Sequence, residues 1–81
     1  MNNQRLKRII MENLPSTDRG QTTRIYLEVA VEQDLKSLGE VYCPQQFIRN
    51  LNELHDTQCL VMFTNGWIKP TRCGLKGFGL T

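Results

Sequence analysis

Four side chains of this sequence belong to the types that bind zinc. Cys43, His55, Cys59 and Cys73 could supply nitrogen and sulfur ligands, and His55 and Cys59 are four residues apart, one helical turn. Structural zinc sites usually take their ligands in closely spaced pairs, however, and the sequence contains no Cys-x-x-Cys pair. We therefore expect no metal, no other cofactor and three reduced thiols that behave as small apolar groups.

Catalytic chemistry finds little support in the sequence. The single histidine, His55, stands beside Asp56, but no nucleophile accompanies the pair in sequence. The run GLKGFG lacks the preceding strand and the following helix of a phosphate-binding glycine loop. We expect a protein that is not an enzyme and whose last residues, from about 70 to 81, form a mobile glycine-rich tail.

Composition indicates one small domain that covers residues 1–81. Hydrophobic residues make up 40% of the chain, which suffices for a core. The sequence has neither an apolar run of the roughly 20 residues that span a bilayer nor a secretory signal, so we expect a cytoplasmic location and no membrane partner. Net charge is only +2, but residues 63 to 81 carry three basic residues and no acid. Such a segment either solvates a surface or attracts an anionic partner.

Periodic apolar residues predict three helices. The first covers about residues 3–14, before Pro15, and the third covers residues 44–55, with Pro44 in its first turn. The second, from about 22 to 38, is ambiguous, because residues 25–31 alternate as in a strand while Leu27, Val31 and Leu35 recur at helical spacing. We favour a helix, since the helical spacing continues after the alternation stops.

A β-hairpin is predicted next, around the stretch FTNGWIKP. Asn65-Gly66 indicates a two-residue type I′ turn, because glycine adopts and asparagine tolerates a positive φ. Residues 59–64 and 67–69 supply the strands, and Pro70 ends the second because it has no N–H. The expected fold class is α+β, with three helices followed by a C-terminal hairpin. This hairpin should pack on Leu27, Val31, Phe47, Leu51 and Leu54.

This order of elements resembles the winged helix-turn-helix superfamily. The resemblance rests on PQQFIRNLNEL followed by CLVMFTNGWIKP and covers about residues 4–69. It implies that the third helix enters the major groove of DNA and that the hairpin, or wing, contacts the adjacent backbone or minor groove. Small prophage and plasmid regulators look similar, so the resemblance implies a transcriptional regulator of a phage or other mobile element. Whether it acts as a monomer or a homodimer stays open.

The resemblance also assigns roles to individual residues. Base-reading candidates, whose amide or guanidinium groups can pair with adenine or guanine, are Gln45, Gln46, Arg49 and Asn50. Phosphate-binding candidates are Lys69, Arg72 and Lys76. The chain departs from the superfamily pattern in its long link between the second and third helices, and in PSTDRGQT, where no strand is evident.

Binding to a host protein is the alternative function. Trp67 beside Phe63 could close the core as a cross-strand aromatic pair. It could instead stay exposed with Ile68 and Met62, since aromatic residues and methionine are enriched in interface cores. The chain would then act as an inhibitor or adaptor that occupies a host protein's surface through the hairpin.

Overall fold

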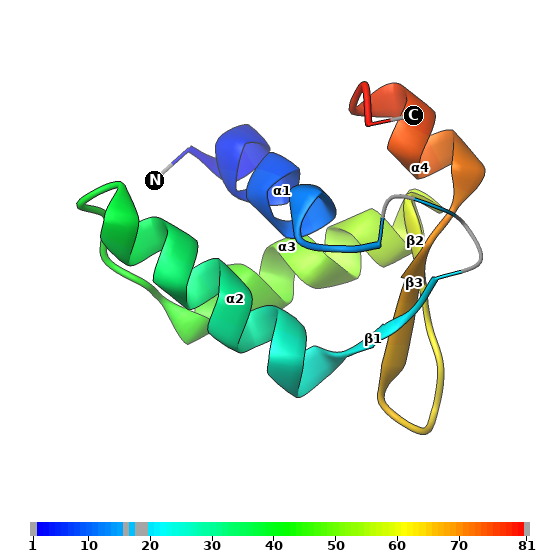
Figure 1. Ribbon diagram of the computed structural model, residues 1–81, viewed down its shortest axis with the longest axis horizontal. Coiled ribbons are helices and arrows are strands. Elements are labelled where there is room, and N and C mark those ends of the chain that lie inside the picture. Colours follow the sequence, from blue (N-terminus) through cyan, green and yellow to red (C-terminus); the bar gives the residue numbers. More distant parts are fainter. Residues whose placement is uncertain (1, 16, 18–19, 81) are drawn as a thin grey trace.

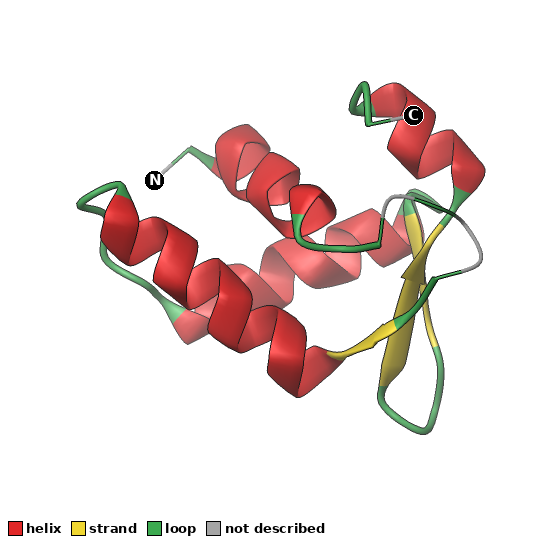
Figure 2. Ribbon diagram, viewed as in Figure 1, coloured by secondary structure: helices red, strands yellow, loops and turns green. Residues whose placement is uncertain are grey.

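The computed structural model describes residues 2–15, 17 and 20–80, and in this part of the chain it contains four helices and a small antiparallel sheet (Figure 1). The elements are α1 (Asn3–Glu12), β1 (Thr22–Thr23), α2 (Arg24–Ser37), α3 (Pro44–Asp56), β2 (Leu60–Met62), β3 (Trp67–Pro70) and α4 (Arg72–Gly77). The α+β class is confirmed. The predicted order is incomplete, because β1 lies between α1 and α2 and α4 follows the hairpin (Figure 2).

The three predicted helices form close to their predicted bounds. α1 begins after Asn2, whose Oδ1 accepts a hydrogen bond from the backbone N–H of Gln4 at 2.7 Å. α2 begins after Thr23, whose hydroxyl oxygen accepts from the N–H of Tyr26 at 3.2 Å. Residues 25–31 are therefore helical, as favoured. Pro44 occupies the first turn of α3, where a missing N–H leaves no intrahelical bond unmade.

The sheet has the strand order β1-β3-β2, and both pairs are antiparallel. Ile68 in the middle strand pairs with Thr22 on one side and with Met62 on the other. β3 extends through Pro70, one residue beyond the predicted strand 67–69, and Pro70 pairs with Leu60 at the end of the ladder. A strand as short as β1 is defined by its pairing with β3 rather than by a pattern of its own.

The hairpin loop differs from the predicted type I′ turn. Asn65 does not adopt a positive φ, whereas Gly66 has a φ of 87°. The N–H of Gly66 donates to the carbonyl oxygen of Phe63 at 3.1 Å. The N–H of Phe63 donates to the carbonyl oxygen of Trp67 at 2.8 Å. The loop therefore has three residues, 64–66, with a tight turn followed by a glycine bulge. A type I′ turn requires a positive φ at both of its central residues, whereas in this loop only Gly66 has one.

The core lies between the helices and the inner face of the sheet. The five residues on which the hairpin was expected to pack are all buried, namely Leu27, Val31, Phe47, Leu51 and Leu54. α1 adds Leu6, Ile9, Ile10 and Met11, and the hairpin adds Leu60 and Ile68. One cluster thus joins α1, α2, α3 and the sheet.

Residues 72–77 form α4 where a mobile tail was expected. The hydroxyl of Thr71 accepts from the N–H of Gly74 at 2.9 Å and donates to the carbonyl oxygen of Gln58 at 2.6 Å. Gly74 approaches the start of β2 so closely that a Cβ atom there would lie 2.0 Å from the carbonyl oxygen of Cys59. Leu75 is buried in the core. Here glycine allows close packing rather than disorder.

Candidate nucleic-acid interface

The outward side of α3 carries a short row of hydrogen-bonding side chains, which we call the α3 row. Gln45, Arg49 and Asn52 are exposed and follow one another at spacings of four and three residues, so they share one side of the helix. Ile48, between them in sequence, is 38% exposed. A guanidinium fork can pair with guanine, an amide with adenine, and an apolar side chain can contact the methyl group of thymine. The α3 row has the chemistry of a base-reading surface.

Two predicted base-reading residues face α1 instead. Asn50 is fully buried, and its Nδ2 donates to the carbonyl oxygen of Gln46 at 2.8 Å and to Oδ1 of Asn3 at 3.3 Å. Nε2 of Gln46, which is half-buried, donates to the same Asn3 oxygen at 3.2 Å. The prediction for Asn50 is therefore wrong, because its side chain joins α3 to α1 and cannot reach a base. Asn52, which was not predicted, lies on the outward side.

Tyr42 fixes the long link between α2 and α3. Its hydroxyl donates a hydrogen bond to Oε2 of Glu28, which lies in the first half of α2, and its ring centroid lies 6.1 Å from that of Phe47 in α3. Burial, followed by the bond to the Glu28 carboxylate, raises the pKa of the Tyr42 phenol well above its ordinary value. These contacts hold the link against both helices, so they help to determine where α3 begins.

The hairpin presents Trp67 and Lys69 on one face of the sheet and buries Ile68 and Pro70 on the other. Its loop, residues 64–66, carries no charge. The start of α2 adjoins this loop, because the backbone N–H of Arg24 donates to the carbonyl oxygen of Gly66 at 3.0 Å. The Arg24 side chain is exposed and adds a second positive charge to this part of the surface.

The three predicted phosphate-binding residues are separated in space. Lys69 lies in β3, whereas Arg72 and Lys76 lie on the exposed side of α4. Figure 1 shows α4 at the end of β3 opposite the hairpin loop. Arg72 and Lys76 therefore belong to a different part of the surface from the hairpin loop.

Apolar side chains are exposed where α2 meets the hairpin, and we call this region the α2–hairpin apolar surface. Its members and their exposed fractions are Ile25 at 76%, Tyr26 at 68%, Phe63 at 42% and Trp67 at 37%. A shallow pocket of about 280 Å³ lies between Tyr26 and Trp67. Ile68, expected on such a surface, is buried and is excluded from it, and Met62 is half-buried. The exposed surface around Trp67 thus extends onto α2.

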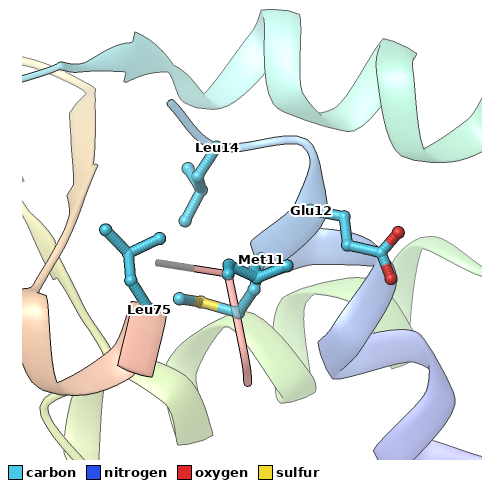
Figure 3. A pocket seen from close by; sticks show the side chains of 5 residues that line it. Met11, Glu12, Leu14 and Leu75 are labelled. Atoms are coloured by element: carbon cyan, nitrogen blue, oxygen red, sulfur yellow. The ribbon is translucent and has the colours of Figure 1, made fainter. Parts of the chain in front are cut away.

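Other parts of the described chain offer less chemistry. A pocket of about 270 Å³ is lined by Met11, Glu12, Leu14, Leu75 and Leu80, and in Figure 3 the Glu12 carboxylate points away from the leucine side chains. The three cysteines are free thiols. Among the residues described, no three His, Cys, Asp or Glu side chains lie together as metal ligands would, and no helix has the length and apolar character to cross a membrane.

Comparisons of this chain with protein-family models, curated proteins and solved structures give no match. Its function must be inferred from the arrangement of its own residues.

Proposed function

We propose that this protein is a small, non-enzymatic DNA-binding regulator of the winged helix-turn-helix type, of the kind that phages and other mobile elements carry. The observation that carries the proposal is the exposed α3 row in a chain with the element order α1-β1-α2-α3-β2-β3. A winged helix has a short strand between its first two helices, and β1, paired with β3, corresponds to that strand. A DNA-binding role implies the cytoplasm as the compartment.

In this proposal the first half of α3 lies in the major groove. Arg49 pairs with a guanine, and Gln45 and Asn52 are within reach of neighbouring bases on the same side of the helix. Asp56, one turn beyond Asn52, would repel phosphate if α3 entered the groove along its whole length. The negative charge therefore favours contact through the N-terminal part of α3.

The hairpin and the start of α2 would contact the DNA backbone beside the groove. Lys69 and Arg24 are the cations available there. With so few phosphates neutralised, the slope of log affinity against log salt concentration should be shallow, at about −0.9 for each phosphate contacted. The low net charge of +2 agrees with modest non-specific affinity.

Titration of a mixed pool of duplexes at rising salt, followed by selection of the bound sequences, tests the proposal. We expect salt-dependent binding with a preference for a short sequence. Arg49→Ala should reduce discrimination at one base pair by about 1–3 kcal/mol, because a bidentate base contact is lost. Lys36→Ala, which removes an exposed cation on α2 near Glu32, is the matched control and should leave the preference unchanged. The absence of duplex binding at low salt would refute the proposal.

A second candidate function is favoured by the α2–hairpin apolar surface. Trp67 and Tyr26, with a pocket between them, are side chains of the type that anchor protein interfaces. Large apolar groups exposed together on a small domain mark a binding surface more often than chance exposure. On this view the protein is an inhibitor or adaptor that occupies a host protein's surface.

A further inference from the structure

A group of exposed basic residues lies away from the α3 row. Arg5 and Arg8 of α1 and Lys76 of α4 are exposed, and we call these three residues the α1–α4 basic face. Arg5 and Arg8 line the groove between the two helices, and Lys76 precedes the lining residue Gly77 in sequence. A broad groove of about 510 Å³ lies between the two helices, lined by Asn2, Gln4, Arg5, Arg8, Gly77 and Phe78. No acidic residue is part of that lining. The groove therefore offers positive charge and amide groups to an anion.

Arg8 fixes the geometry of this groove. Its Nη1 donates to the carbonyl oxygen of Phe78 at 3.1 Å, and its Nε lies 3.0 Å from Oε1 of Glu12. The first contact holds the end of α4 against α1, and the second neutralises the nearest carboxylate. Over the described residues, Arg5 and Lys76 form no ion pair. Their charges are thus available to a ligand.

Charge is distributed unequally over the rest of the molecule. Lys7, the remaining cation of α1, is engaged by Glu53 of α3 at 2.8 Å. Most acidic residues that the structure describes lie on α2 and the link after it, namely Glu28, Glu32, Asp34 and Glu40. These acidic residues lie on elements other than α1 and α4, so an anion can approach Arg5 and Lys76 without meeting them.

The α1–α4 basic face and the α3 row lie on opposite sides of the α1–α3 pair. α1 packs on the inner side of α3, where Asn3 contacts Asn50 and Gln46. Arg5 and Arg8 lie on the side of α1 that is turned away from its buried residues. Figure 1 shows α1 in front of α3, with α4 beside the end of the sheet. The side of α1 that carries Arg5 and Arg8 therefore faces away from α3.

We propose that the α1–α4 basic face binds the phosphate backbone of a second duplex segment, so that one protein molecule bridges two segments of DNA. The proposal rests on the proposed function, because the first segment is the one read by α3. Guanidinium and ammonium groups suit phosphate without regard to base sequence, so the second contact is sequence-independent. It would bring together a specific site and any neighbouring DNA.

A two-colour bridging assay tests the proposal. Two duplexes with different fluorophores, one carrying the selected site, are mixed with the full chain, and energy transfer between them is measured at rising salt. We expect the unaltered protein to bridge them and Arg5→Ala combined with Lys76→Ala to lose bridging while keeping its preference for the selected site. Bridging by the unaltered protein should weaken as salt rises, by about 0.9 log units of affinity per log unit of salt for each phosphate contacted.

Lys36→Glu is the matched control, because both variants lower the formal net charge from +2 to zero. It should bridge as the unaltered protein does. Bridging that survives in the double variant would overturn the proposal, as would a protein that binds one duplex selectively and bridges none. Failure of the unaltered protein to bind any duplex would refute the proposed function as well, so the two failures are distinguishable.

Discussion

Helical spacing decides which polar residues of α3 are available to a partner. Asn50 follows Phe47 by three residues and precedes Leu54 by four, so it lies on the buried side of the helix. Asn52 falls outside that side and is exposed. The signal that separates the two asparagines was present in the sequence. Residue type and nearness to the helix start do not separate the two asparagines, whereas spacing does.

We expect Asn50→Asp to destabilise the protein strongly and Asn52→Asp to change its stability little. A carboxylate at position 50 would be buried without a cation, which costs about 3–5 kcal/mol in the free energy of unfolding. At position 52 the new charge is hydrated, and the change should stay within about 0.5 kcal/mol. Urea unfolding monitored by circular dichroism measures both. The loss at position 50 should shrink as pH falls toward about 4, because burial favours the protonated carboxyl group in the folded state. Equal stabilities would contradict the burial of Asn50.

Tyr42 provides a second prediction at the scale of a single residue. Tyr42→Phe removes the hydrogen bond to Glu28 and should lower the free energy of unfolding by about 1 kcal/mol at neutral pH. Because the pKa of Tyr42 is raised in the folded state, the unfolded phenol ionises first, from about pH 10. The unaltered protein should lose this contribution as pH rises further. The difference in the free energy of unfolding between the unaltered protein and Tyr42→Phe, which we call the gap, should therefore narrow.

Unfolding titrations between pH 7 and the alkaline range measure this gap. Tyr26→Phe, at a tyrosine that is 68% exposed, is the control, because it removes a phenol that lies outside the core. A gap for Tyr42→Phe that stays constant through the alkaline range would argue against the buried bond.

At the scale of elements, the sequence predicted the helices and the hairpin, which are formed by interactions between residues close in sequence. The three helices have apolar stripes and suitable first residues, and the hairpin has Gly66 at its loop. β1 and α4 were not predicted, because both depend on distant partners. β1 has two residues that pair with β3, and α4 is six residues long and relies on contacts with Gln58 and Cys59. Short elements of this kind carry little periodicity of their own.

Two glycines of α4 allow a matched test of its packing. Gly74→Ala should destabilise the protein by about 3 kcal/mol, because the added Cβ would lie 2.0 Å from a backbone oxygen of Cys59 that cannot move aside cheaply. Gly77→Ala meets no atom within 4 Å and should change stability by less than about 0.5 kcal/mol, since alanine favours helix. Thermal unfolding of the two variants compares them. If both changes are tolerated, α4 does not pack against the start of β2.

At the scale of the whole molecule, the candidate site was predicted in part. Gln45 and Arg49 come from one exposed helix side, which spacing reveals. Lys69, Arg72 and Lys76 are close in sequence, but α4 takes the last two away from the hairpin. The sequence predicted only the hairpin part of the α2–hairpin apolar surface. Tyr26 and Trp67 are far apart along the chain and meet through the pairing of β1 with β3.

The two candidate functions share the hairpin but depend on different side chains, so they are independently testable. Arg49→Ala with Lys69→Ala alters charge on the proposed DNA surface, and Tyr26→Ala with Trp67→Ala alters the α2–hairpin apolar surface. A DNA regulator should lose site preference and about one unit of salt slope in the first variant, and should keep both in the second. A host-protein inhibitor should lose its partner in the second variant only, because removal of an aromatic anchor costs about 2 kcal/mol or more.

Fluorescence anisotropy with the selected duplex and quantitative capture from host lysate provide the two measurements on the same four samples: unaltered protein, both double variants and Lys36→Ala. Thermal unfolding of each sample separates a lost contact from a lost fold, which matters most for Trp67 because its neighbour Ile68 lies in the core. If Arg49→Ala with Lys69→Ala leaves DNA affinity and site preference unchanged, the proposal of a DNA-binding regulator is refuted. Capture that depends on Tyr26 and Trp67 would then assign the protein to its partner's pathway.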